Sequence, residues 1–500
     1  MVARLLSRRT FARGALAVAG AGMVTGSLGG GDLLAARAAA AAPWRAAPEP
    51  GSGRLHEIAF EAAEREMALF GPDETPVRVW SYADKPFPVV RINRGDRVRA
   101  EVHNRLTEHV SVHWHGLRIP NAMDGVQYLT QPPIQPGERF TYDFTPPDPG
   151  TFFFHPHCNE SGQVGRGLAG IMVVEGDERV KPDGELILAV KDWRLGPDGR
   201  WLEFSTPQGA SRGGTFGTRR STNGRRAFSA EVPAAADLRV RLLNLDSSRV
   251  MEIGIEGATA AIVAVDGHAV RPIPLDRSGQ ETWRMGPAMR LDLLVRTPRP
   301  GAVAKIIDYQ SAEPWTVAAL AAAGKPRRRG ALDADILYRP VFPEPDLAHA
   351  EALSWTFMAA SDSVASFADA AGSDPAQRLL MDSLCVSERT YWSINKLSWP
   401  NAADRRLPPP LGVLTAGRTY RFELVNATPH PHPIHLHGHV FRVVSSSERA
   451  RMPAYAADTV LLSPKERVEI AFVATAGDWM FHCHILEHLE TGMMGYLRVV

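Results

Sequence analysis

Cysteine is scarce in this chain, since its 500 residues include only Cys158, Cys385 and Cys483. Three cysteines allow at most one disulfide within the chain, and one cysteine is then left over. Neither sign of charge prevails, because 56 basic residues stand against 55 acidic residues. That balance gives no argument for nucleic acid or an anionic membrane surface as a partner. The length exceeds one ordinary hydrophobic core, so we expect about two to four domains.

Long apolar runs are absent as well. The Ala/Gly run that follows Arg8 and Arg9 is interrupted by glycines and by Asp32, which argues against a membrane-spanning helix and stable membrane insertion. The stretch "SRRTFARGALAVAGAGMVTGS" resembles a twin-arginine export signal, and "ARAAAAAP" has the small residues that a signal peptidase accepts. We therefore expect residues 1–42 to be a signal peptide that the twin-arginine translocase recognises. The mature protein would then be periplasmic or otherwise exported from a bacterium; a disordered basic tail is the alternative.

The rest of the chain consists of short runs in which apolar and polar residues alternate. Examples are "RVRAEVHN", "RFTYDFT" and "RVEIAFV", separated by segments rich in glycine and proline. Alternation with a period of two residues is typical of β-strands that have one buried face. The sequence therefore predicts an all-β protein.

Two distant parts of the chain share one pattern. The stretch "RGDRVRAEVHN" ends at Asn104, and "AGRTYRFELVN" ends at Asn426. Nine residues after each asparagine comes the first histidine of a His-x-His-Gly sequence, at His113 and at His435. Further on, "GERFTYDFTPPDPGTFFFHPH" matches "KERVEIAFVATAGDWMFHCH", and a glycine precedes the first histidine of each by five residues. Chance does not readily give the same spacing twice, so we interpret these parts as internal repeats.

A third copy lies between them without its histidines. The stretch "LRVRLLN" ends at Asn244, and the positions nine and eleven residues later are Ile253 and Ile255. The sequence thus predicts three copies of one β-domain, at residues 50–180, 181–345 and 346–500. The outer two carry candidate metal ligands, and the middle one has apolar residues in their place.

The histidines gather in four clusters that follow the repeat: "HWH", "HPH", "HPIHLH" and "HCHILEH", which hold 10 of the 17 histidines. Side chains on a strand alternate between its two faces, so both imidazoles of a His-x-His point to the same side and can bind one metal centre. In "HCH", Cys483 points to the opposite side. We infer that Cys483 ligates a second metal and joins two metal sites through a few covalent bonds.

The candidate partners of Cys483 are His432, His488 and Met493. Two histidines, one thiolate and a weak axial methionine make the trigonal blue-copper arrangement. Zinc is the competing metal, but a structural zinc site would use four ligands at one centre and leave eight histidines unexplained.

The four clusters, their order and the pattern "HCHxxxHxxxxM" resemble the multicopper oxidases, the family of laccases, ascorbate oxidase and bacterial cuprous oxidases. The resemblance extends from about residue 75 to the end of the chain. It implies three cupredoxin-like domains, which are Greek-key β-sandwiches, and four coppers: one of type 1, one of type 2 and a type 3 pair. Carried over position by position, the ligands are His432, Cys483, His488 and axial Met493 for type 1; His113 and His435 for type 2; and His115, His155 and His484 with His157, His437 and His482 for type 3.

The resemblance also implies acids beside the cluster that donate protons during oxygen reduction. Asp124 in "NAMDGV" and Glu487 in "ILEH" occupy those places. Each acid has a second interpretation, as a hydrogen-bond acceptor that orients a ligating histidine.

The implied reaction is the one-electron oxidation of four reductant molecules, coupled to the reduction of dioxygen to water. The reductant would bind over His488, and electrons would pass through Cys483 to His482 and His484. An axial methionine lowers the potential relative to a non-coordinating residue, which favours electron-rich phenols and a laccase-like oxidase. Dioxygen and a small-molecule or metal-ion reductant are thus the expected partners, and we expect a monomer.

Three other functions compete with this one. A periplasmic cuprous or ferrous oxidase would share every copper ligand, but the 14 methionines are scattered rather than gathered in one segment. A copper nitrite reductase would need fewer histidines and no type 3 pair. A non-enzymatic cell-division protein of this fold lacks the copper ligands.

Cys158 follows "HPH" directly, and Cys385 lies in "MDSLCVSERTYW". With Cys483 committed to copper, these two cysteines can pair only with each other within the chain, and an oxidising compartment favours a disulfide. Two separate buried thiols are the alternative.

Overall fold

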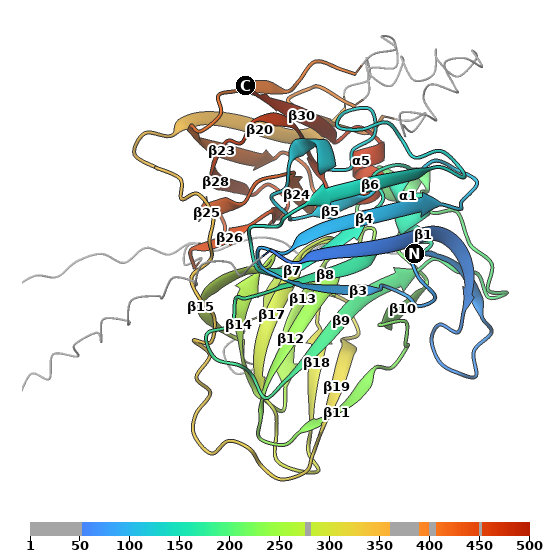
Figure 1. The fold of residues 1–500 in the computed structure, drawn as a ribbon, viewed down its shortest axis with the longest axis vertical. Helices are drawn as coiled ribbons and strands as arrows, with labels where there is room; N and C mark the ends of the chain where they lie inside the picture. The colour runs from blue at the N-terminus through green and yellow to red at the C-terminus, as the bar shows by residue number, and fades with distance from the viewer. Residues whose placement is uncertain (1–52, 276–281, 361–389, 400–406, 450–452) are drawn as a thin grey trace, which may run out of the picture. The chain divides into compact units, whose positions relative to one another are not determined.

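The structure, a computed structural model, describes residues 53–275, 282–360, 390–399, 407–449 and 453–500. These residues form short strands in six sheets, joined by turns and very short helices (Figure 1). The helical segments among them are η1 (Asn121–Met123), α1 (Glu160–Gly165), α2 (Pro207–Ala210) and α5 (Leu486–Glu490). The prediction of an all-β protein is therefore confirmed. None of these helices has the length or the apolar character needed to cross a membrane.

The sheets come in three pairs along the chain. The first pair has the strand orders β2-β1-β4-β6 and β3-β8-β7-β5. Its strands are β1 (Leu55–Met67), β2 (Val77–Ser81), β3 (Val89–Asn93), β4 (Arg97–Asn104), β5 (His113–His115), β6 (Arg139–Phe144), β7 (Gly150–His155) and β8 (Gly170–Glu175).

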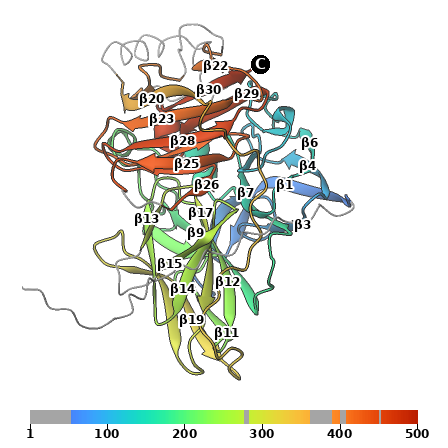
Figure 2. The same ribbon diagram turned by 90° about the vertical axis from the view of Figure 1, so that its left-hand side faces the viewer.

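The second pair has the orders β10-β9-β12-β17-β14-β15 and β11-β19-β18-β13-β16, and Figure 2 shows both sheets below the third pair. Its strands are β9 (Gly184–Trp193), β10 (Arg219–Thr222), β11 (Ser229–Pro233), β12 (Asp237–Asn244), β13 (Met251–Glu256), β14 (Thr259–Val265), β15 (His268–Leu275), β16 (Trp283–Met285), β17 (Arg290–Arg296), β18 (Val303–Asp308) and β19 (Trp315–Ala323).

The third pair has the orders β21-β20-β23-β28-β25-β26 and β22-β30-β29-β24-β27. Its strands are β20 (Glu351–Ala359), β21 (Trp392–Ile394), β22 (Gly412–Leu414), β23 (Thr419–Asn426), β24 (His432–Leu436), β25 (Phe441–Ser446), β26 (Tyr455–Ala457), β27 (Thr459–Leu462), β28 (Arg467–Val473), β29 (Gly477–Cys483) and β30 (Met494–Val499).

The repeated sequence pattern corresponds to a repeated strand pairing. The strands β4, β12 and β23 each pair in parallel with an earlier strand, β1, β9 and β20 respectively. Each also pairs in antiparallel fashion with a later strand, β6, β17 and β28. Three sheet pairs with this common pairing agree with three cupredoxin-like β-sandwiches. The three pairs belong to one compact unit, Trp44–Val500, and the exact boundaries between the domains stay a prediction.

The strand that follows the repeat differs in what it carries. In the outer copies it is β5, which holds His113 and His115, and β24, which holds His435 and ends one residue before His437. In the middle copy it is β13, whose Ile253 and Ile255 are buried in the hydrophobic core. In the middle copy these two positions therefore contribute to the hydrophobic core, and this copy holds none of the predicted metal ligands.

A buried ionic network joins the second sheet pair to the first. Arg239 of β12 lies fully inside the protein and binds Asp177, which follows β8, and Asp292 of β17. Thr151 of β7 donates a hydrogen bond of 2.9 Å from Oγ1 to Asp292 Oδ1. Burial alone would lower the pKa of Arg239, but the two carboxylates raise it well above its ordinary value. The guanidinium is thus held charged, and each carboxylate has a cation beside it.

We predict that Arg239→Met destabilises the protein by about 3–5 kcal/mol, because it removes the cation paired with buried Asp177 and leaves buried Asp292 with Arg241 alone. Denaturant unfolding followed by tryptophan fluorescence would measure the loss. Arg328→Met is the matched control, since Arg328 pairs with Asp183 at the surface and its loss should change stability little. Equal effects of the two substitutions would contradict the prediction.

Candidate metal centre

Two antiparallel strand pairs bring the histidine clusters together. In the first sheet pair, β5 lies beside β7 with His113 opposite His155. In the third sheet pair, β24 lies beside β29 with His435 opposite His482. Because residues opposite each other in such a pair are close neighbours on the same face, each pair of strands presents its imidazoles as one group.

The two groups face each other and form one buried cluster. The rings of His115 and His435 stack at 3.8 Å between centroids, as do the rings of His113 and His437. All members are at most 4% exposed, and they are His113, His115, His155, His157, His435, His437, His482 and His484. The outer repeats, more than 300 residues apart in sequence, thus supply one site between them.

The ring nitrogens of this cluster form three groups of three, within each of which the atoms lie no more than 4.8 Å apart. Two of these groups are the triplets that the sequence assigned to the type 3 pair. The third joins the predicted type 2 ligands His113 and His435 to His115. The groups are His115, His155 and His484; His157, His437 and His482; and His113, His115 and His435.

The hydrogen bonds of several rings leave one ring nitrogen without a partner among the described residues. His113 Nδ1 donates to the carbonyl oxygen of Asp124, and His435 Nδ1 to that of Asp458, both at 2.8 Å. His155 Nδ1 donates to the carbonyl oxygen of Pro156 at 2.8 Å. A neutral imidazole that donates through Nδ1 carries its lone pair on Nε2.

The remaining nitrogens lack a hydrogen-bond partner among the described residues. They include the Nε2 atoms of His113, His155, His157 and His435, and Nδ1 of His115. Several buried lone pairs that converge without a donor are unfavourable in an apolar interior, whereas a soft or borderline cation satisfies them all at once. The residues present therefore fit a group of copper ions.

Burial also holds these rings in their neutral form. Removal from water lowers the pKa of His115, His155, His157, His437, His482 and His484 well below the ordinary value. Neighbouring histidines lower it further, since a charge on one ring disfavours a charge on the next. Neutral imidazole is the form that ligates a metal.

A second group of ligands lies on the opposite face of β24 and β29. Sγ of Cys483 is 3.5 Å from Nδ1 of His432 and 3.6 Å from Nδ1 of His488, and the two nitrogens are 3.1 Å apart. All three residues are 0% exposed. Burial raises the pKa of the Cys483 thiol, so a thiolate at this place requires a cation beside it. The structure thus brings together the two histidines and the cysteine that the sequence assigned to the blue-copper site.

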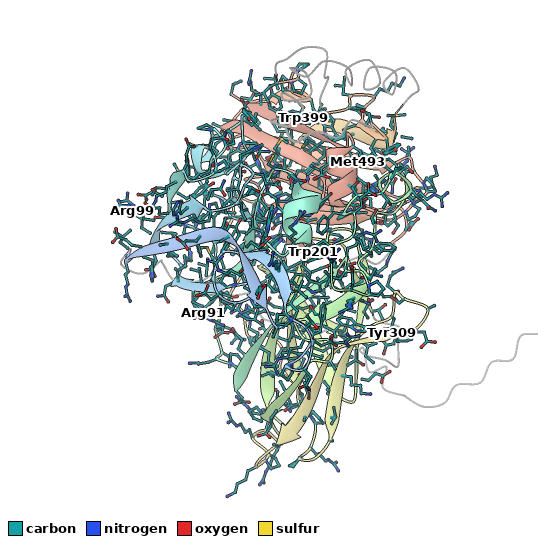
Figure 3. All side chains as sticks on the ribbon, turned by 90° about the vertical axis from the view of Figure 1, so that its right-hand side faces the viewer. Arg91, Arg99, Trp201, Tyr309, Trp399 and Met493 are labelled. Atoms are coloured by element: carbon teal, nitrogen blue, oxygen red, sulfur yellow. The ribbon has the colours of Figure 1, made fainter. Side chains whose placement is uncertain are left out.

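The backbone positions the predicted axial ligand. Cys483 N–H donates to the carbonyl oxygen of Met493 at 3.0 Å, and Met493 N–H donates to that of His488 at 2.8 Å. Met493 is fully buried, and Figure 3 shows it among the strands of the third sheet pair. The turn at the end of α5 therefore holds cysteine, histidine and methionine in one small loop.

Sequence reasoning missed Asp458, which orients ligands from both outer repeats. Its Oδ1 accepts a hydrogen bond of 3.0 Å from His115 Nε2, while its carbonyl oxygen accepts from His435. Arg290 of β17 binds its carboxylate through Nη1 at 2.9 Å and through Nη2 at 2.5 Å. Burial would raise the pKa of Asp458, but Arg290 and His115 hold it well below the ordinary value. The middle, ligand-free sheet pair thereby helps to position the cluster.

The two predicted acids differ in their surroundings. Asp124 Oδ2 accepts a hydrogen bond of 2.8 Å from His437 Nδ1, which agrees with its orienting role. Glu487 instead accepts hydrogen bonds from the backbone N–H and the Oγ1 of Thr215, the latter at 2.6 Å, and from Ser248 at 3.4 Å. Both partners belong to the second sheet pair's segment of the chain. Proton donation by either acid stays a prediction.

A further pair of buried acids lies beside the cluster. Glu160 Oε1 is 3.3 Å from His157 Nδ1, and neither of its oxygens has a hydrogen-bond partner among the described residues. Burial and the neighbouring Glu490 raise the pKa of Glu160 well above its ordinary value. Burial raises the pKa of Glu490 to about 7. No residue pattern around Glu160 marks it, because its role depends on α1 packing against α5.

Cys158 is disulfide-bonded, whereas Cys483 is a free, buried thiol. Cys385, the partner predicted from the sequence, lies outside the described residues, as do residues 1–52. The pairing of Cys158 with Cys385 and the signal peptide at residues 1–42 therefore stay predictions.

Known proteins can be compared with this site and fold. Two family models described as multicopper oxidase match residues 66–179 and residues 379–500. A multi-copper oxidase of Pseudomonas thermotolerans has a similar crystal structure, with 35% identity, a TM-score of 0.77 and coverage of 90% of this chain and 100% of that one. Multicopper oxidase MmcO of Mycobacterium tuberculosis is 28% identical over 478 residues, 89% of this chain and 88% of that one. Other curated relatives carry the names of laccases and of iron transport multicopper oxidases.

The neutral histidines make the copper-free protein sensitive to acid. Burial lowers the pKa of His488 to about 3 and those of His268 and His439 to about 4, against about 6.5 in an unfolded chain. As the pH falls below about 6.5, the unfolded chain binds more protons than the folded one, so stability is present above that pH and is lost below it. Each such histidine contributes up to about 1.4 kcal/mol per pH unit.

We therefore predict that the melting temperature of the copper-free protein falls steeply between about pH 6.5 and pH 4.5. Replacement of the exposed His349 by glutamine is the control and should leave the curve unchanged. A melting temperature that stays constant over this range would show that the buried histidines are not held neutral.

Proposed function

Because the chain belongs to the multicopper oxidase family, and is thus a copper-dependent oxidoreductase that uses dioxygen, we propose that it is a laccase-like oxidase of phenols. The observation that carries this proposal is the junction at Cys483. Its thiol belongs to one ligand group, and its neighbours His482 and His484 belong to the other. A donor side and an oxygen side are thus joined by the covalent bonds of three consecutive residues.

We further propose that the chain binds four coppers, held as follows. His432, Cys483 and His488, with Met493 as the axial ligand, hold the type 1 ion; His113 and His435 hold the type 2 ion; and the two histidine triplets described above hold the type 3 pair. When bound, copper supplies one-electron redox chemistry, by which four electrons from the donor reduce dioxygen to two waters. The chain contributes fixed imidazole geometry, a dry interior and acids that hold protons.

The surroundings of His488 support phenols over metal ions as donors. His488 Nε2 donates to the carbonyl oxygen of Arg212 at 2.7 Å, and the ring of Trp392 lies 4.6 Å from that of His488. Neither contact offers a thioether or a free carboxylate, the groups that bind Cu(I) or Fe(II). The nearby carboxylate of Glu487 already accepts the hydrogen bonds of Thr215. Metal-ion oxidation is the second candidate, because relatives named for iron transport occur beside relatives named laccase.

Glu160 fits the delivery of protons better than Glu487 does. Oxygen reduction consumes protons at the histidine cluster, and Glu160 faces His155 and His157 directly. Its raised pKa favours the protonated carboxyl group, the form that can serve as an acid. Glu490, which accepts hydrogen bonds from Ser161, lies next to it and can resupply the proton. Glu487, by contrast, positions the segment around Thr215.

The exported location and the monomeric state complete the proposal. Both rest on the sequence: the twin-arginine pattern at residues 1–42 supports export, and the nearly balanced charge of the chain gives no reason for a partner chain.

Copper-loaded protein is predicted to oxidise 2,6-dimethoxyphenol with a higher kcat/KM than Cu(I) or Fe(II), and to show an intense blue absorption band. Cys483→Ser is the control variant, since it removes the thiolate but keeps every histidine. This variant should lose the blue band and the oxidation of every donor, and should retain about three of about four coppers. A kcat/KM for either metal ion far above that for the phenol would favour the second candidate, and a protein that binds only zinc would refute both.

Glu160→Gln is predicted to slow the reoxidation of the fully reduced enzyme by dioxygen by about 10²–10⁴-fold, because it removes the positioned acid. The blue band and the copper content should not change. Glu487→Gln is the matched variant and should leave the reoxidation rate nearly unaltered. Stopped-flow absorbance measures both rates, and a larger effect at Glu487 would return the proton-donating role to that residue.

A further inference from the structure

The outer edge of the type 1 ligand group is covered by residues 205–217, which we call the covering segment. Its contacts come from three points. Trp392 Nε1 donates to the carbonyl oxygen of Ala210 at 2.6 Å, His488 Nε2 donates to that of Arg212 at 2.7 Å, and Thr215 binds Glu487. The segment is therefore fixed over His488.

This segment separates His488 from solvent. His488 is 0% exposed. Its Nε2 donates a hydrogen bond to the carbonyl oxygen of Arg212. A donor in solution thus approaches the Arg212 backbone, and not the ring itself. The hydrogen bond and one peptide group connect exposed Arg212 to the ligand group, so the chemistry of residue 212 affects which donor can approach closely.

Arg212 brings an exposed positive charge to this place. Its side chain is exposed, and it forms no ion pair or hydrogen bond with any described residue. The neighbouring arginines are engaged: Arg249 lies 3.5 Å from a carboxylate oxygen of Asp192, and Arg194 donates to the carbonyl oxygens of Glu203 and Phe216. The carboxylate of Glu487, which lies beside the same segment, already accepts the hydrogen bonds of Thr215.

We propose that Arg212 selects anionic electron donors, and specifically phenols that carry a carboxylate group. This inference rests on the proposed oxidase function and names the substrate class of that same site. The guanidinium attracts a carboxylate and can bind it through two parallel hydrogen bonds, which places the phenol ring against the Arg212 peptide. Metal cations are repelled by the same charge. Neutral phenols gain nothing from it.

The reaction of such a donor balances without any further reactant. Each carboxylated phenol loses one electron and the phenolic proton to become a phenoxyl radical, and its carboxylate is unchanged. Four such donors supply the four electrons, and with four protons one dioxygen becomes two waters. Arg212 takes part in no bond that forms or breaks, so it is a specificity-determining residue.

Two donors that differ by one carboxylate group test the inference. Syringate is 2,6-dimethoxyphenol with a carboxylate opposite the hydroxyl group, and the ratio of their kcat/KM values is compared between variants of the copper-loaded enzyme. We expect Arg212→Gln to lower this ratio by about two- to fivefold, the effect of one exposed ion pair, and Arg212→Glu to lower it further. The blue band and the type 1 reduction potential should stay unchanged. Arg212→Lys should restore most of the ratio.

Arg299→Gln is the matched control, because it removes the same exposed charge from the turn between β17 and β18. It should leave the ratio unchanged. In the wild-type enzyme, added salt should lower kcat/KM for syringate and leave that for 2,6-dimethoxyphenol constant.

The possible outcomes distinguish a failure of the proposed oxidase function from a failure of the proposed role of Arg212. A wild-type enzyme that oxidises neither phenol refutes the proposed function. An enzyme that oxidises both, with a ratio that is the same in wild type, Arg212→Gln and Arg212→Glu, keeps the function and overturns the role of Arg212. A ratio that falls equally in Arg299→Gln also overturns it, since net charge and not position would then be the cause.

Discussion

The structure depends on one unfavourable arrangement: neutral imidazoles and a thiol are buried with their lone pairs directed at each other. Nothing in a hydrophobic core compensates for that arrangement, and the described residues offer no donors to fill it. A cation does, and it also converts repulsion between neighbouring rings into shared coordination. Folding and metal binding are therefore linked, because the same atoms that weaken the empty fold are those that bind the ion.

The middle sheet pair carries none of the predicted ligands, yet its residues contact the groups that orient them. Arg290 from β17 fixes Asp458, which orients His115 and His435 from the two outer repeats. On the other face of the third sheet pair, Thr215 and Arg212 hold Glu487 and His488. A copy without metal ligands can thus still stabilise the site, because its residues lie next to the strands and the helix that carry the ligands.

Much of this arrangement could be predicted from the sequence, and for a clear reason. Strand periodicity and the repeat depend on local order, so the strands β4, β6 and β28 and the register of "HWH" and "HCH" follow from residues that are close in sequence. Asp458, Glu160 and the covering segment do not. Asp458 acts on His115, which is 343 positions away, and Glu160 acts through the packing of α1 against α5. Only three-dimensional proximity identifies such residues. For Glu487, proximity in sequence to His484 gave no indication of the hydrogen bonds that its carboxylate accepts from Thr215, and its role in proton donation stays a prediction.

The alternation of faces along β24 and β29 also limits how the chain can change in length over evolution. Ile434 lies opposite Cys483, and His435 lies opposite His482. One residue inserted between Cys483 and His484 would turn the second histidine toward the thiol, and both ligand groups would be lost in a single event. Loops before and after these strands can grow or shrink without that consequence. Descendants of this sequence should therefore differ most in loop length, while the distance from His482 to His484 stays constant.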